Sequence, residues 1–177
     1  MLEELKATPL SDLDIATRLR GRTRIVMYRE LSGFQNIDEL LIDRSCVILY
    51  EKRPKNGHWV CLLTYMDGDT PVLEFFDSYG FFPDSEKKYI GELFLLASNQ
   101  KKNTLARLLY DASYKYVVEY NNYRLQNRSG LIATCGRHVI SRILLKDMNI
   151  DEYNRFLHSF PGLTPDDVVT IISEYCI

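Results

Sequence analysis

The sequence predicts a single domain of the α+β class. Three apolar segments with strand composition follow one another between residues 45 and 77, and helical spacing of apolar residues dominates the rest of the chain. No internal repeat, low-complexity tract or linker interrupts the 177 residues. We therefore expect residues 1–177 to share one hydrophobic core, with residues 1–30 forming a peripheral helix and a basic segment.

Composition and charge exclude several classes of protein. With 46% hydrophobic and 26% charged residues, the chain has the composition of a folded domain rather than a disordered one. The formal net charge of −2 argues against general affinity for nucleic acid or anionic membranes, and no apolar run reaches membrane-spanning length. The four cysteines are too few and too widely spaced for a disulfide framework, which favours a reducing compartment. The acidic first residues lack the features of a signal peptide, so we expect a cytosolic protein.

The first helix is expected over residues 9–19. Ser11 is a typical N-cap residue, acidic residues follow it in the first turn, and Gly21 is a typical helix end. Residues 37–41 are expected to form a loop or a single helical turn. The basic cluster is interpreted as a solvated surface or as a contact for an anionic partner, and it contains Arg18, Arg20, Arg22, Arg24 and Arg29.

Three strands are expected over residues 45–51, 58–65 and 72–77. Each is rich in β-branched, aromatic and other apolar residues. Residues 52–57 have turn composition, and the Asp-Gly-Asp sequence at 67–69 is a hairpin signal. The three strands should therefore form an antiparallel meander.

The second half of the chain is expected to be mainly helical. Helix patterns cover residues 86–97, 104–112, 135–145 and 151–160, and a last helix opens at Thr164 with proline in its first position. Residues 114–120 return to strand composition. Residues 125–130 form a loop that leads into the helix beginning at Cys135.

Cys135 is the main candidate for a reactive residue. Thr134 is expected to cap its helix, which places the thiol in the first turn, where unpaired N–H groups and the helix dipole favour the thiolate. Gly136 would leave room for a substrate backbone to approach. The alternative is a buried cysteine that serves only to pack the helix.

Three further residues would complete a catalytic site around Cys135. His58 opens the second expected strand and Asp77 closes the third, so hairpin pairing would bring an imidazole and a carboxylate to the same end of the sheet. Gln126 could donate an amide N–H to an oxyanion. Each residue alone has a structural alternative: a packed histidine, a turn aspartate and a solvated glutamine. Together, on the expected elements, they favour nucleophilic catalysis.

Four segments in this order resemble the adenain-like cysteine proteases, a group that includes the adenovirus maturation protease and the proteases of ubiquitin-like proteins. They are Gly57-His58-Trp59-Val60, Phe75-Phe76-Asp77-Ser78-Tyr79-Gly80, Leu125-Gln126 and Thr134-Cys135-Gly136. The small size and the sequence of residues 120–126 are most similar to the enzymes of virophages and Polinton-type elements. The resemblance covers residues 37–145.

The resemblance implies a fold and a set of roles. The fold would be a central mixed sheet of about five strands with helices on both sides. Cys135 would be the nucleophile, His58 the base, Asp77 the third member of the triad and Gln126 the oxyanion donor. The segment between Gln126 and Cys135 is a few residues longer than usual in that family, and Asn127 is the nearest substitute donor.

The resemblance also implies a substrate and a setting. The substrate would be capsid protein precursors, cleaved after small residues, often glycine, during virion maturation in the host cytoplasm and in the virion. In that family the aromatic residue after the histidine packs near the site, which implies the same position for Trp59. Beside Gly136, Trp59 could form the narrow tunnel that a glycine-type site needs. We expect a monomer with no metal, cofactor or membrane partner. DNA acts as a cofactor of the adenovirus relative, which suggests a DNA-linked role for the arginine cluster, although the acidic net charge favours a solvated surface.

Several alternatives stay open at the level of sequence. His58-x-x-Cys61 and Cys135-x-x-His138 could form a zinc site, although residues three apart on a strand point to opposite faces. The same triad could serve a deconjugating protease for ubiquitin-like proteins or an acyltransferase. A different class would be an inactive protease-like module that binds capsid proteins.

Overall fold

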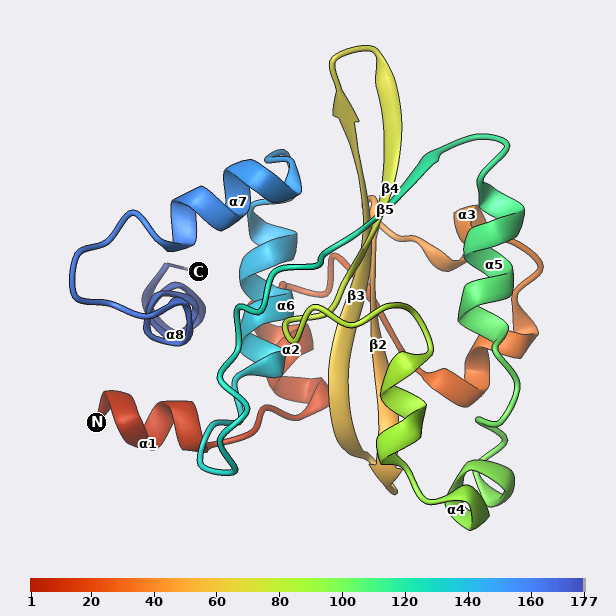
Figure 1. Ribbon diagram of the computed structural model, residues 1–177, viewed down its shortest axis with the longest axis horizontal. Helices are drawn as coiled ribbons and strands as arrows, with labels where there is room; N and C mark the ends of the chain where they lie inside the picture. Colours follow the sequence, from red (N-terminus) through yellow and green to blue (C-terminus); the bar gives the residue numbers. More distant parts are fainter. Residues whose placement is uncertain (177) are drawn as a thin grey trace.

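The computed structural model describes residues 1–176, so Ile177, the last residue of the expected domain, lies outside the described residues. A five-stranded sheet runs through the middle of the molecule, and helices cover both of its faces (Figure 1). The strand order is β1-β2-β3-β4-β5. The structure confirms the predicted α+β class.

The centre of the sheet is the predicted antiparallel meander. It consists of β2 (Ser45–Arg53), β3 (Asn56–Asp67) and β4 (Thr70–Phe76). β2 and β3 are longer than the sequence predicts, because their pairing continues to Arg53 and Asn56, and β3 also pairs with β4 as far as Asp67. Gly68 adopts φ +58° in the second hairpin, as the Asp-Gly-Asp turn signal requires.

The two outer strands make the sheet mixed. β1 (Arg24–Met27) pairs in parallel with β2, and β5 (Val117–Tyr120) pairs in parallel with β4. β5 lies within the predicted strand at 114–120. β1 was not predicted, since it is a short edge strand inside the arginine-rich segment, and its partner lies about twenty residues further along the chain.

One face of the sheet carries the helices that position Cys135. α6 (Cys135–Leu144), α7 (Ile150–Leu157) and α8 (Pro165–Tyr175) lie on this face together with α2 (Asp12–Arg18) (Figure 1). Their apolar side chains share one core with the strands, including Ile15, Val139, Ile140, Tyr153 and Val169. A buried ion pair between Arg142 of α6 and Glu74 of β4 joins the helix to the sheet at 2.7 Å.

The opposite face is covered by shorter helices. These are the 3₁₀ helices η1 (Tyr28–Gly33) and η2 (Ser85–Tyr89), with α3 (Ile37–Leu40), α4 (Glu92–Ala97) and α5 (Thr104–Ala112). The predicted helix at 86–97 is wrong as one element. Ile90 is extended and Gly91 starts a new helix, which breaks the segment into η2 and α4.

The N-terminal segment is less peripheral than the sequence predicts. α1 (Leu2–Ala7) packs against α8, where the buried Lys6 ammonium lies 2.7 Å from Asp167, and Leu10, Ile15 and Leu19 belong to the core around α6. Apolar contacts with α6 and α8 therefore hold this segment in place.

The predicted basic cluster is paired only in part: Arg20 and Arg22 are exposed, whereas the other three arginines have partners. Arg18 pairs with Glu174, Arg24 donates to the Leu40 carbonyl, and Arg29 pairs with Glu51.

Within residues 1–176, no helix combines the length and apolar character needed to cross a bilayer.

Candidate active site

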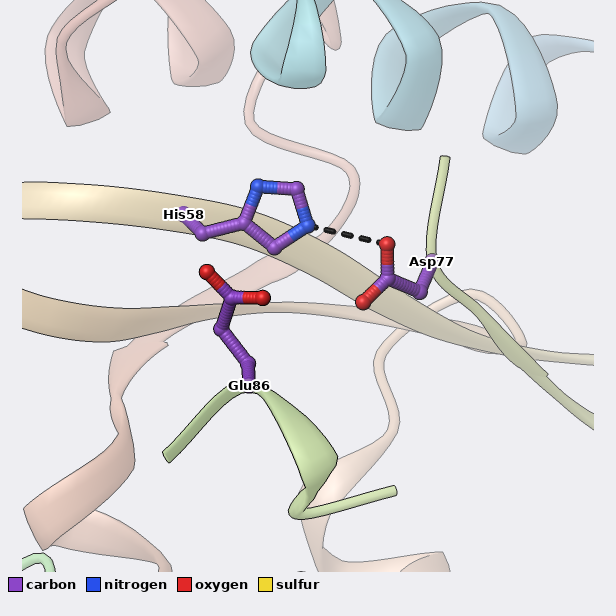
Figure 2. A group of neighbouring side chains, drawn as sticks. All are labelled: His58, Asp77 and Glu86. Carbon is purple, nitrogen blue, oxygen red and sulfur yellow. Dashed lines mark hydrogen bonds and ion pairs between the residues drawn. The ribbon is translucent and has the colours of Figure 1, made fainter. Parts of the chain in front are cut away.

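The site is built first on the hairpin of β3 and β4. Antiparallel pairing places Cys61 opposite Phe76, so His58, three residues earlier on β3, lies beside the segment that follows β4. The Nε2 atom of His58 donates to Oδ1 of Asp77 at 3.0 Å (Figure 2). The two side chains are 3% and 1% exposed, so the predicted pairing of imidazole and carboxylate occurs away from bulk water.

Backbone and side-chain contacts fix the Asp77 carboxylate. Oδ1 also accepts from the backbone N–H of Tyr79 at 2.7 Å, and the Asp77 carbonyl accepts from the Asn121 side chain at 2.6 Å. The Tyr79 ring stacks on the His58 imidazole with a centroid separation of 4.6 Å. Asp77 thus holds the imidazole at its edge, and the Tyr79 ring holds it at its face.

Cys135 is the first residue of α6, as predicted, and its sulfur faces His58. Burial alone would raise the pKa of the Cys135 thiol. The hydrogen bond and charge of His58, together with the backbone N–H groups of Trp59 and Gly136, outweigh burial and lower this pKa below its ordinary value.

The imidazole of His58 responds in the opposite direction. Burial lowers its pKa, but Asp77 and then Cys135 outweigh burial and raise the pKa well above its ordinary value. Because Nε2 is bonded to Asp77, Nδ1 is the ring nitrogen left to serve Cys135. The arrangement favours a thiolate beside an imidazolium.

Gln126 is connected to the same site. Its side chain is 1% exposed, and its Oε1 accepts from the Ser78 hydroxyl at 2.7 Å. The backbone N–H groups of Leu125 and Gln126 both donate to the Ser78 carbonyl. Ser78 directly follows Asp77, so these bonds fix Gln126 relative to Asp77 and leave its amide nitrogen as the donor end. Asn127 is exposed and its side-chain oxygen accepts from the N–H of Ser129.

Trp59 and Gly136 lie side by side, but they pack against the N-terminal segment. The Trp59 indole is 4% exposed and donates to the Leu10 carbonyl at 3.0 Å. A Cβ on Gly136 would lie 3.1 Å from Cβ of Leu10 and 3.4 Å from the indole. The need for glycine here comes from close packing of α6 on this segment. The expected tunnel wall for a substrate glycine is therefore occupied on this side by the protein's own chain.

Asp166 is a buried residue of the site that sequence reasoning missed. It accepts from the hydroxyl of Thr134, from the backbone N–H of Asn127 at 2.9 Å and from Nε2 of His138 at 3.0 Å. The prediction that the Thr134 side chain caps α6 is therefore wrong. Instead Asp166 fixes the residue before Cys135 and the residue after Gln126. Its sequence context, Thr164-Pro165-Asp166, indicated only a helix start.

Comparison with known proteins identifies a viral family. No family model matches the chain. The chain is 36% identical over 179 residues to the uncharacterized protein V9 of Sputnik virophage, an alignment that covers 97% of this chain and 99% of that protein. The chain belongs to the V9 family.

The fold of this V9-family chain is similar to that of the ASFV pS273R protease. Two crystal structures of that protease superpose with TM-scores of 0.51 and 0.52, at 17% and 16% identity. Each superposition covers 94% of this chain and 67% of the protease chain. The comparison shows a shared fold, a mixed sheet flanked by helices.

The geometry does not support the zinc site considered from the sequence of this V9-family protein. His138 lies fully buried against Asp166, and Cys61 is a fully buried member of the core. Cys135 faces His58 rather than His138. His58, Cys61, Cys135 and His138 therefore do not converge on one point, as a shared zinc ion would require.

Aromatic side chains cover the site on the side of the η2 helix. Tyr79 lies on His58, and the Arg128 guanidinium lies 4.3 Å from the centroid of Phe81 and 5.5 Å from that of Tyr79. Burial and then the Cys135 charge raise the pKa of Tyr79 to about 12, so its hydroxyl stays protonated. A cavity of about 310 Å³ opens here, lined by Lys52, Tyr79, Phe81, Glu86, Tyr89 and Arg128.

Proposed function

We propose that the protein is a cysteine endopeptidase of the adenain-like type, with Cys135, His58 and Asp77 as its triad. The observation that carries this proposal is the position of Cys135 at the start of α6, against a buried imidazole that is bonded to Asp77. The fold shared with a viral protease and the virophage relative support it.

The geometry suggests the following course of reaction. The Cys135 thiolate attacks a peptide carbonyl, and the carbonyl oxygen becomes an oxyanion that the Gln126 amide and the backbone N–H of Cys135 stabilise. His58 then gives its Nδ1 proton to the leaving amine while the C–N bond breaks. His58 next takes a proton from water, and the hydroxide that results releases the acyl group and restores the thiolate.

The proposed substrates are capsid protein precursors, cut after small residues or glycine during virion maturation. The family membership shared with a virophage protein supports a viral setting, in the host cytoplasm and in the virion.

The test is incubation of the protein with candidate capsid precursors and mass spectrometry of the new termini. The unmodified protein should cut at defined positions, and Cys135→Ala should lose several orders of magnitude in rate while its circular dichroism and unfolding midpoint stay normal. Near-normal cleavage by Cys135→Ala would overturn the assignment of the nucleophile. Transfer of the acyl group to an amine rather than to water would instead identify an acyltransferase.

A further inference from the structure

A third carboxylate lies against the catalytic pair. Glu86 of η2 reaches toward the His58 ring and Asp77 from the face of the sheet opposite α6 (Figure 2). Potential ligand atoms of His58, Asp77 and Glu86 all lie within 4.8 Å of one another. Within residues 1–176 these side chains form the one cluster of three or more groups with this spacing.

Two oxygens of this cluster have no partner. Oδ2 of Asp77 and Oε2 of Glu86 are buried and accept no hydrogen bond from the described residues. The Glu86 side chain is 2% exposed, and its other oxygen, Oε1, is held by the Lys52 ammonium at 2.8 Å. Lys52 and the protonated His58 offset the charge of the two carboxylates, but they leave these two buried oxygens without a partner and available as ligands.

We propose that His58, Asp77 and Glu86 bind a divalent transition-metal cation, and that this cation holds the protease in an inactive state. One imidazole and two carboxylates are a ligand set that suits Zn²⁺ and similar ions. Zinc bonds of about 2.0–2.2 Å separate two ligands by at most about 4.4 Å, so small side-chain movements close the site. Lys52 fixes Glu86 through the oxygen that the ion does not use.

The inactivation follows from the atom that the ion takes, and this part rests on the proposed function. Nε2 of His58 now donates to Asp77. A cation on Nε2 occupies that position and prevents the doubly protonated imidazolium from forming, so His58 no longer stabilises the Cys135 thiolate. The cavity beside Glu86, between Tyr79, Tyr89 and Arg128, gives the ion a path from solvent.

The deciding experiment measures zinc binding without relying on activity. In the full-length Cys135→Ala protein, which lacks the thiol that would bind zinc by itself, calorimetric titration with zinc chloride should show one site. Adding Glu86→Gln should weaken this affinity by on the order of 100-fold. The matched control is Glu92→Gln, because Glu92 also pairs with a lysine but is exposed, and it should leave binding unchanged. Equal affinity with and without Glu86 would overturn the proposal.

A second measurement keeps the test sharp if Glu86→Gln does not fold. In the Cys135→Ala protein with Glu86 intact, zinc should shift the imidazole nitrogen NMR signals of His58 and leave those of His138 and His158 in place. Unshifted His58 signals at saturating zinc would refute the site. In proteins that retain Cys135, zinc should inhibit peptide hydrolysis, and Glu86→Gln should require more zinc than Glu92→Gln for the same fractional loss of its own zinc-free rate. An inactive but zinc-binding protein would contradict the proposed function and leave the metal site standing.

Discussion

At the scale of single residues, the site depends on two side chains that change each other's protonation. The pKa of Cys135 is lowered and that of His58 is raised, so a pH range exists in which the thiol is ionised and the imidazole is protonated. Peptide hydrolysis should rise as pH increases through the lowered pKa of Cys135. It should fall again as pH passes the raised pKa of His58. The dependence of kcat/KM on pH should be bell-shaped.

Alkylation tests this pair directly. Iodoacetamide should modify Cys135 rapidly at pH 7, and His58→Ala should slow the reaction about tenfold for each unit by which the pKa of Cys135 returns to its ordinary value. Mass spectrometry of the digested protein follows each cysteine separately. Cys176, which is exposed, serves as an internal reference in the same sample. A His58→Ala protein in which Cys135 reacts as fast as before would contradict the ion pair.

Asp77 should contribute less than His58. Asp77→Asn keeps an oxygen that accepts from His58 and from the N–H of Tyr79, but removes the negative charge that raises the pKa of His58. We expect a smaller loss of kcat than in His58→Ala. The alkaline limb of the pH profile should also move to lower pH, because His58 now loses its proton more easily. Complete and equal loss of activity in both folded variants would show that this division of roles is wrong.

At the scale of elements, the sequence predicted what depends on local patterns. The meander, α5, α6 and the capped start of α8 follow from composition, turn residues and periodicity. The break between η2 and α4 did not, because the apolar spacing continues across Gly91 and only the packing on the sheet decides where the chain turns. β1 was missed since its partner is far along the chain.

The same distinction applies to the site. His58, Asp77 and Cys135 were predicted because each lies at the end of a recognisable element, and the structure places them together. Glu86 and Asp166 were not, since their positions arise from long-range contacts. Asp166 is 39 residues from Asn127 and 32 from Thr134 in sequence. A pattern within one helix carries no information about such contacts.

The first turn of α8 should act on catalysis through position alone. Asp166→Asn replaces one carboxylate oxygen by an NH2 group. Facing the N–H of Asn127, this group cannot accept the hydrogen bond, which should displace the loop that carries Gln126. A displacement of about 1 Å can cost about 100-fold in rate. We expect kcat to fall more than KM changes, while alkylation of Cys135 stays fast because His58 is untouched.

The adjacent residue provides the control for this prediction. Asp167→Asn alters the same helix turn and removes the same charge, but Asp167 contacts Lys6 and Thr164 rather than Asn127 and Thr134. It should lower stability without the selective loss of kcat. If both variants lose only stability, Asp166 is a structural residue and not a positioning residue.

At the scale of the whole molecule, the N-terminal helix α1 and the last helix α8 meet beside α6, the helix that carries Cys135. α1 lies against α8 (Figure 1). The carbonyl of Lys6 accepts from the backbone N–H of Ala133, two residues before Cys135, and the carbonyl of Leu5 accepts from the buried Arg137 guanidinium. The N-terminal helix therefore supports the start of α6, although it lies outside residues 37–145, which carry the sequence motifs.

Removal of this support should affect both stability and activity. Deleting residues 1–7 exposes the apolar surface beneath α1, removes the Leu5 carbonyl that accepts from Arg137 and removes the Lys6 partner of Asp167. Lys6→Met is the finer change, since it keeps the helix but leaves the Asp167 carboxylate unpaired, which should lower the free energy of unfolding by on the order of 3 kcal/mol. Urea unfolding measures this quantity, and peptide hydrolysis by the folded fraction measures the effect on the site. Glu4→Gln, a change at a highly exposed side chain of the same helix, should alter neither. A truncated protein with unchanged stability and hydrolysis would contradict this prediction. Neither the ion pair to α8 nor the hydrogen bonds to Ala133 and Arg137 would then be needed to hold the start of α6 in place.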